Sequence, residues 1–164
     1  MRSFFSFPDP VNEIAARLVA TGVVAMTALF LATGWEWLLA VIAYGFVARV
    51  LSGPKISPLG LLVTRVIEPR LPIEVRLTPG PPKRFAQGIG ATLSVAAVVS
   101  YFALGLTPVA YVLIAAILVA ASLEAFVGFC LGCKIFGILM RIGVIPDSVC
   151  LACSDISLRR PVAS

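Results

Sequence analysis

The chemistry of this chain is concentrated in four cysteines that form two Cys-x-x-Cys pairs. The first pair is Cys130 and Cys133, the second is Cys150 and Cys153, and 16 residues separate the pairs. Two short pairs with such a spacer are typical of a tetrahedral site in which four thiolates hold one metal ion. The spacing therefore predicts a tetracysteine site for zinc, with iron as the alternative because it accepts the same four sulfur ligands.

The spacer between the pairs has a pattern that would let them converge on one ion. Residues 134–142 are helical in pattern, and Gly143 is placed to end that helix. Residues 145–147 can open another short turn, with Asp147 or Ser148 as its cap. For the two pairs to share one metal ion, the chain must turn back toward the first pair after this helix.

Thiol–disulfide exchange is the alternative chemistry for the same residues. Exchange needs one thiol with a lowered pKa and a second thiol that resolves the mixed disulfide. Cys130 and Cys133 supply both thiols, and the charge of Lys134 would favour the thiolate. Two dithiols within reach could also pass a disulfide or a sulfane sulfur between them. No βαβ pattern surrounds either pair, so a thioredoxin fold is not expected. Four inert buried cysteines are disfavoured by their pairing.

The rest of the composition excludes several kinds of catalytic or metal site and indicates a membrane protein. The chain contains no histidine, which excludes His-ligated haem, Cys/His zinc sites and Ser-His triads. It is 60% hydrophobic and 13% charged, whereas soluble domains carry about 25% charged residues. This composition is typical of a polytopic membrane protein.

Four apolar stretches are long enough to cross a bilayer: residues 18–34, 35–52, 85–106 and 107–129. Short links join the first stretch to the second and the third to the fourth, which predicts two helical hairpins. A long segment, residues 53–84, joins the hairpins. A cleavable signal peptide is disfavoured for the first stretch because Asp9 and Glu13 precede it and no small-residue cleavage site follows.

The distribution of charge predicts the orientation in the membrane. All 13 Lys and Arg residues lie at the N-terminus, in or beside residues 53–84, or after Phe129, and the short links have none. By the positive-inside rule, both termini, the long segment and the cysteines are expected in the cytoplasm, where thiols stay reduced. The net charge of +5 follows from this distribution, and no nucleic-acid partner is expected.

The long segment and the ends of the spans contain residues that are expected to lie at the membrane interface. Ser57 and Pro58 should begin a short amphipathic helix over residues 59–67 that lies in the membrane interface and stops at Pro69. Residues 73–77 alternate as an extended segment would. Arg49 is expected to extend toward the lipid headgroups, and Trp35 and Trp37 to lie in the interfacial belt.

Glu124 is an ionisable residue inside the fourth stretch, where such groups usually face other helices. We expect it to be buried and hydrogen-bonded to Gln87 of the third stretch or to a basic residue at the cytoplasmic edge. On a straight helix it would lie roughly 9 Å from Cys130 and point away from it. A structural role is therefore preferred to proton transfer.

Four stretches of the sequence resemble the bacterial membrane-protein family known as domain of unknown function 4395. They are residues 9–13, 53–62, 82–88 and 128–133, and the Phe-Ala-Gln-Gly and Gly-Phe-Cys-x-Gly-Cys parts are the most specific. The resemblance implies a small helical membrane protein with a Cys-x-x-Cys after the last span, and it implies no established activity. It also implies that some relatives carry only the first pair, which leaves room for a dithiol role.

These observations predict an all-α, four-helix bundle integral to the bacterial inner membrane. Residues 1–129 form the bundle, with the loop 53–84, and residues 130–164 form a cysteine-rich cytoplasmic cap. One functional hypothesis is a zinc-bound cap with a structural or docking role, as in an accessory subunit of a larger membrane complex. The other is a membrane oxidoreductase or sulfur relay that uses Cys130 and Cys133 with a thioredoxin-like or sulfurtransferase partner. The lipid bilayer surrounds the protein in both.

Overall fold

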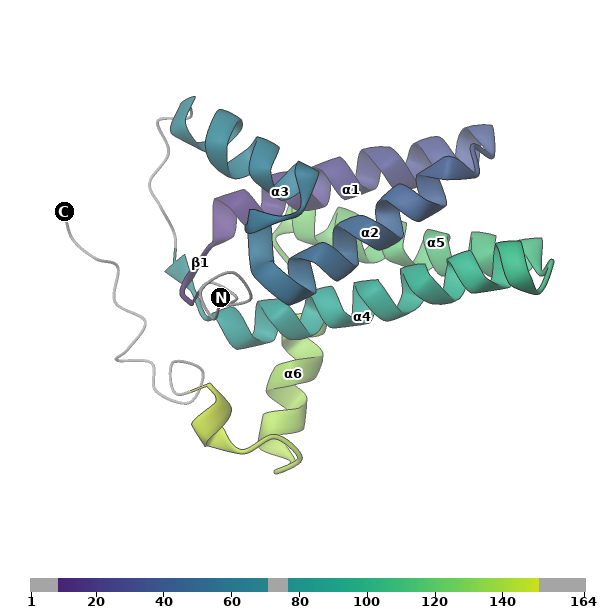
Figure 1. The fold of residues 1–164 in the computed structure, drawn as a ribbon. Coiled ribbons are helices and arrows are strands. Elements are labelled where there is room, and N and C mark those ends of the chain that lie inside the picture. The colour runs from purple at the N-terminus through teal and green to yellow at the C-terminus, as the bar shows by residue number, and fades with distance from the viewer. Residues whose placement is uncertain (1–8, 71–76, 151–164) are drawn as a thin grey trace.

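Four long helices packed side by side form the body of the protein (Figure 1). The structure, a computed structural model, describes residues 9–70 and 77–150. The long helices are α1 (Glu13–Thr33), α2 (Trp37–Ser52), α4 (Gly80–Val98) and α5 (Thr107–Ser122). The last two continue as π-helical turns, Val99–Ala103 after α4 and Leu123–Val127 after α5.

The prediction of four apolar helices is confirmed, because four helices in the described part of the chain are long and apolar enough to cross a membrane. Two of them begin earlier than the apolar pattern suggested, at Glu13 rather than residue 18 and at Gly80 rather than residue 85. Local capping explains both extensions. The side chain of Asn12 accepts a hydrogen bond of 3.0 Å from the amide of Ile14. Prolines fill the first turn of α4, where no intrahelical N–H donor is needed.

The core lies between the two hairpins. Helix α2 packs against α4, α1 against α5, and α4 against α5. The largest buried side chains at the centre are Phe30, Leu39, Ile42 and Ile114. Buried Thr27 donates its hydroxyl to the carbonyl of Val23 at 2.8 Å, so it leaves no polar atom unpaired. Close packing of this kind holds helices together where lipid replaces water.

The loop between the hairpins contains the predicted short helix. Helix α3 (Pro58–Leu62) is followed by a π-helical turn (Val63–Ile67) and a 3-10 turn (Glu68–Arg70). Ser57 caps α3 as expected, with its hydroxyl accepting from the amide of Gly60 at 3.3 Å. The helical path runs one residue past Pro69, because a 3-10 turn tolerates proline there. Val63 is buried against α1, so this helix covers the bundle.

A small antiparallel sheet was not anticipated by the all-helical prediction. Strand β1 (Val11–Asn12) pairs with β2 (Leu77–Thr78), in the register Val11 to Thr78. The carboxylate of Asp9 also accepts a hydrogen bond of 2.9 Å from the amide of Gly80. These contacts tie the chain before α1 to the start of α4. The predicted extended segment lies mostly at residues 71–76, outside the described residues.

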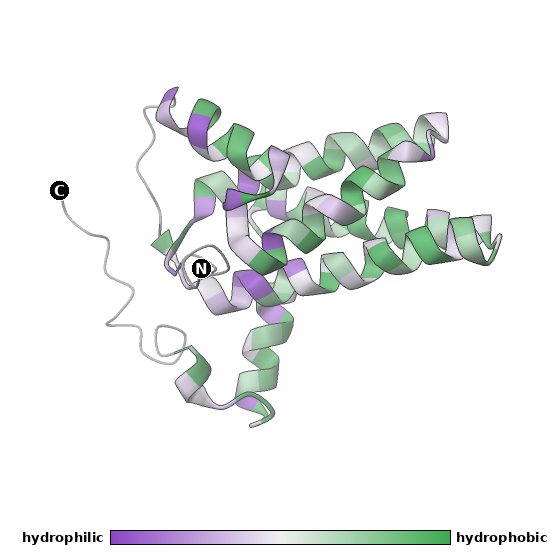
Figure 2. Ribbon diagram, in the orientation of Figure 1, coloured by the Kyte–Doolittle hydropathy of each residue, from purple (hydrophilic) through white to green (hydrophobic). Residues whose placement is uncertain are grey.

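Helix α6 (Leu131–Arg141) leaves the bundle at a steep angle to its long helices (Figure 1). It begins three residues before the predicted start, and Gly143 with a φ of 78° follows it. The predicted second turn is present as a 3-10 helix, Asp147–Val149. Figure 2 shows hydrophilic residues gathered at the end of the bundle that carries β1, α3 and α6. The first cysteine pair therefore lies at the polar end of the molecule.

Candidate functional site

The first cysteine pair forms a compact dithiol at the N-terminus of α6. Cys130 is the N-cap residue, with an extended backbone of φ −86° and ψ 104°. Its Sγ accepts hydrogen bonds from the backbone amide of Cys133 at 3.4 Å and from the Cys133 thiol at 2.6 Å. A Cys-x-x-Cys spacing produces this contact because the N-cap side chain and the third helical residue face each other. Both cysteines are free thiols and half-buried.

Two glycines determine how the chain enters α6. Gly128 has a φ of 73°, in the left-handed region that side chains rarely adopt, and it turns the chain after the π-helical turn. Gly132 lies against α4 so closely that an added Cβ would be 2.5 Å from the Cβ of Ala86. The two glycines of the Gly-Phe-Cys-x-Gly-Cys motif therefore have separate tasks. One reverses the chain, and the other lets α6 press on α4.

Arg17 of α1 fixes the turn from the opposite side. Its guanidinium donates hydrogen bonds of 3.2 and 3.1 Å to the carbonyl of Ala125 and one of 3.2 Å to that of Phe126. These carbonyls belong to the last helical turn, where no intrahelical donor remains for them. A cation from the first span thus caps the fourth span directly before the cysteines.

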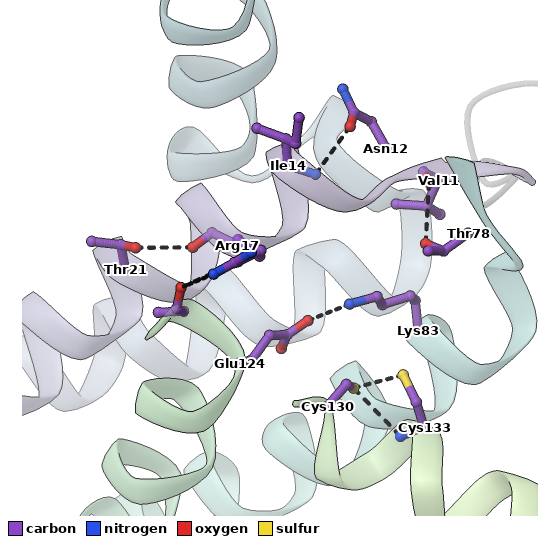
Figure 3. A network of polar contacts seen from close by, with 11 residues as sticks. Val11, Asn12, Ile14, Arg17, Thr21, Thr78, Lys83, Glu124, Cys130 and Cys133 are labelled. Carbon is purple, nitrogen blue, oxygen red and sulfur yellow. Dashed lines mark hydrogen bonds and ion pairs between the residues drawn. The ribbon is translucent and has the colours of Figure 1, made fainter. Parts of the chain in front are cut away.

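An ion pair lies next to the dithiol. Lys83 near the start of α4 donates to Glu124 of the π-helical turn, with 2.5 Å between Nζ and Oε1 (Figure 3). Only 10% and 15% of the two side chains are exposed. Burial of this pair close to Cys130 and Cys133 places one cation and one anion in the field of the sulfurs.

The pKa values of the two thiols shift in opposite directions. The pKa of Cys130 is lowered, chiefly by the hydrogen bond from the Cys133 thiol, with help from the charge of Lys83. Burial and the charge of Glu124 act in the opposite direction. The pKa of Cys133 is raised, because its proton is held by Cys130 and because burial disfavours a second thiolate. Of the two sulfurs, Cys130 therefore has the greater thiolate character, and Cys133 holds the shared proton.

The cation that assists Cys130 is not the one the sequence suggested. Lys134 is adjacent to Cys133 in sequence, but its Nζ lies over the ring of Phe129, 5.6 Å from the centroid. Lys83, 47 positions before Cys130 in the chain, acts on the thiolate instead. The sequence contains only a weak indication that Lys83 matters. Lys83 lies in the Pro-Lys-Arg-Phe-Ala-Gln-Gly stretch, which contains one of the two most specific parts of the family resemblance.

The expected partner of Glu124 is corrected in part. Glu124 binds a basic residue at the polar end, which was one of the two expected arrangements, and does not bind Gln87. The amide of Gln87 accepts instead from Nε of Arg49 at 2.9 Å, and Nη1 of Arg49 donates to Ser57 at 3.3 Å. Arg49 is only 4% exposed, so the expectation that it extends toward headgroups is wrong. Hydrogen bonds to Gln87 and Ser57 hold the Arg49 guanidinium inside the bundle, so it does not extend to water at the membrane surface.

Glu124 shares a cavity with Cys130, although a straight helix would point it away from that cysteine. The fourth span ends in a π-helical turn, and Gly128 then bends the chain back. As a result Glu124 and Cys130 line the same cavity, and the carboxylate raises the pKa of Cys130. The expectation that Glu124 points away from Cys130 assumed a continuous α-helix, which the π-helical turn and Gly128 interrupt.

The second cysteine pair is only partly within the described residues. Cys150 is buried and disulfide-bonded, so the expectation of four reduced thiols is not met there. Cys153 lies outside the described residues. Within residues 9–70 and 77–150, no group of three or more His, Cys, Asp or Glu side chains could hold a metal ion. The tetracysteine zinc or iron site stays a prediction from the spacing.

A large groove opens beside both sulfurs of the first pair. It has a volume of about 960 Å³ and lies between the start of α4, the β2 strand and α6. Three cations line it, Lys83, Lys134 and Arg141, against the single carboxylate of Glu13 among the described lining residues. The groove leaves both sulfurs open to one side, and its lining carries more positive than negative charge.

Comparison with known proteins identifies a family for most of the chain. The family model described as "Domain of unknown function (DUF4395)" matches residues 11–141. The match includes all four long helices, α6 and the first cysteine pair, and it ends before the second pair. No curated protein and no solved structure matches the chain.

Proposed function

The chain belongs to the DUF4395 family, and we propose that it is a membrane thiol–disulfide oxidoreductase. Cys130 is its nucleophile and Cys133 is its resolving thiol. The observation that carries the proposal is the 2.6 Å contact between the two sulfurs at a helix N-terminus, with opposite pKa shifts of the two thiols. A helix N-terminus and a nearby lysine are the surroundings that make a cysteine reactive.

The reaction proceeds in two exchanges. The Cys130 thiolate attacks one sulfur of a partner disulfide, which forms a mixed disulfide and releases the other partner sulfur as a thiolate. That thiolate takes the proton of Cys133. The Cys133 sulfur then attacks Cys130, the Cys130–Cys133 disulfide forms, and the second partner sulfur leaves and is protonated by water. Two electrons have passed to the partner, and the same steps in reverse reduce the Cys130–Cys133 disulfide.

The basic groove supports a partner from the aqueous side of the polar end. A thioredoxin-like protein or a sulfurtransferase with an acidic surface around its reactive cysteine fits the three lining cations. We place this end in the cytoplasm of the inner membrane, with both termini on that side, because the two links at the opposite end of the bundle contain no Lys or Arg.

A second candidate function is favoured by the cysteine spacing. In the reduced chain, Cys130, Cys133, Cys150 and Cys153 would hold zinc in a structural cap, with which the protein docks in a larger membrane complex. Zinc binding would remove the free dithiol, so the two candidates differ in thiol count and metal content.

The deciding experiment uses the full chain purified in detergent micelles under anaerobic conditions. Cys133→Ser should accumulate a mixed disulfide with oxidised glutathione through Cys130, detected by mass spectrometry, because the resolving thiol is missing. Cys130→Ser, as the control, should accumulate none at Cys133. Metal analysis of the same samples should give less than one zinc per chain. One zinc per chain with no mixed disulfide would reject the oxidoreductase and support the cap.

A further inference from the structure

A second, apolar cavity lies on the inner side of Cys130. It has a volume of about 220 Å³ and lies between α1, α4, α5 and α6. Side chains such as Val23, Leu93 and Ile117 form most of its wall, and Glu124 is the only charged residue among the described residues that line it. A cavity of about 150 Å³ holds one benzene ring. This cavity therefore has room for a substituted six-membered ring.

One residue belongs to both the inner cavity and the basic groove. Among the described residues that line the two spaces, only Cys130 is shared. Cys133 lines the groove alone. The Lys83–Glu124 pair spans the same wall, since Lys83 lines the groove and Glu124 the cavity. The nucleophilic sulfur is thus reachable from water on one side and from an apolar space among the spans on the other.

The mouth of the cavity faces an apolar surface of α6. Leu131 and Ile135 line the cavity and are exposed, and Ile138 and Ile142 continue the same stripe at helical spacing. Because α6 runs at a steep angle to the long helices (Figure 1), this stripe follows the plane of the membrane at the polar end. A molecule dissolved in lipid can therefore approach Cys130 beneath α6.

We propose that the inner cavity binds the ring of a lipid-soluble quinone, which takes electrons from the Cys130–Cys133 dithiol. This inference rests on the proposed oxidoreductase and names its second substrate. In the reaction the S–H bond of Cys133 breaks and a bond forms between the two sulfurs. The quinone gains two electrons, one proton from Cys133 and one from water, and becomes a quinol. Cys130 thiolate, Cys133 thiol, quinone and one proton thus give the disulfide and the quinol.

The test uses the full chain in lipid nanodiscs, reduced with dithiothreitol, desalted and kept anaerobic. Decylubiquinone is added, its reduction is followed by ultraviolet absorbance, and free thiols are counted in parallel. We expect one quinone reduced for each Cys130–Cys133 disulfide formed, and no reduction by Cys130→Ser. Exchange with oxidised glutathione is measured on the same samples, because it reports the proposed function without the cavity.

Variants test whether the quinone reacts in this cavity. Ala120→Leu fills it from α5, and Ala116→Leu is the matched control, because Ala116 is an exposed residue one turn earlier on the same helix that does not line the cavity. Ile135→Trp obstructs the mouth, with Ile142→Trp as its control outside both spaces. Each obstructing variant should weaken the apparent affinity for decylubiquinone about tenfold, equivalent to about 1.4 kcal/mol. Exchange with glutathione should stay within a factor of about two, and the controls should match the parent.

The possible failures are distinguishable. A parent protein that exchanges with glutathione but does not reduce decylubiquinone overturns the quinone inference and leaves the oxidoreductase standing. Equal quinone reduction by each obstructing variant and its control overturns the assignment to this cavity. A parent protein that does neither reaction overturns the proposed function and this inference together.

Discussion

At the scale of single residues, the reactivity of the site depends on which charges surround Cys130. Its sulfur accepts two hydrogen bonds from Cys133 and lies near a buried pair of opposite charges. Lys83 and Glu124 act on the pKa of Cys130 in opposite directions. The pair therefore affects the pKa of Cys130 without adding a net charge to the partly buried site. An uncompensated charge there would be costly to desolvate.

Removal of the cation should make Cys130 less acidic. In Lys83→Met the charge that lowers the pKa of Cys130 is lost, while the charge of Glu124 that raises it remains. The midpoint of iodoacetamide alkylation against pH should therefore move upward, and the rate at neutral pH should fall. Lys134→Met is the control, since Lys134 lies over Phe129. An equal shift in both variants would contradict the assignment of Lys83.

Removal of the anion should have the opposite effect. Glu124→Gln deletes the charge that raises the pKa of Cys130, so the alkylation midpoint should move downward. The glutamine keeps an oxygen that can accept from Lys83, so the variant should still insert, but the buried charge of Lys83 is no longer balanced and the melting temperature should fall in a thermal scan. If disulfide exchange were abolished while the bundle stayed intact, Glu124 would be a proton carrier rather than a structural partner.

At the scale of elements, the position of α6 on α4 decides whether the sulfurs meet their surroundings. Gly132 is the contact point, and nothing larger fits there without moving Ala86 or α6. The same contact brings Cys130 to Lys83, because α4 and α6 each carry one half of the site. The packing of one short helix therefore determines which charges lie near the two sulfurs.

A methyl group at this contact should displace the helix. Gly132→Ala should lower the free energy of unfolding by about 1–3 kcal/mol, as overpacking of a tight contact does, and should slow disulfide exchange by Cys130. Gly137→Ala is the matched control on the same helix, because an added Cβ there meets no atom within 4 Å. Thermal unfolding and glutathione exchange of both variants check the prediction, and equal stabilities would contradict it.

At the scale of the whole molecule, one end of the bundle carries the site and most of the charge (Figure 2). The opposite end carries the hairpin links and the exposed, stacked Trp35 and Trp37. This polarity agrees with a protein that spans a membrane and works on one face of it. It is also what the proposed exchange site would need in order to be reached from both water and lipid.

The orientation itself can be measured with reporter fusions in a bacterial host. Fusions within residues 33–35 and 105–107 should report the outer side, because the links there have no Lys or Arg. Fusions after Ser154 should report the cytoplasm. The link fusions and the C-terminal fusion serve as controls for each other, since they must report opposite sides of the membrane. A C-terminus on the outer side would refute the predicted topology and the cytoplasmic partner.

The sequence by itself determined the four apolar helices, their two hairpins and the short helix after Ser57. Hydrophobic length, capping residues and prolines act locally, so they can be read from neighbouring positions. The dithiol was also identifiable, because a Cys-x-x-Cys at a helix start brings its own sulfurs together. These features need no knowledge of which helix packs against which.

Only the tertiary structure decided what surrounds the dithiol. Lys83, Glu124, Arg17 and Ala86 come from three different helical segments, and they meet at Cys130 and Gly132 because of packing. The burial of Arg49 and the shared wall of two cavities arise in the same way. Such contacts join residues far apart in the chain, and a charge acts through space rather than along the sequence. The spacing of the cysteines predicts a sulfur site and its internal hydrogen bond, and the packing of α6 on α4 determines which charges surround the two sulfurs.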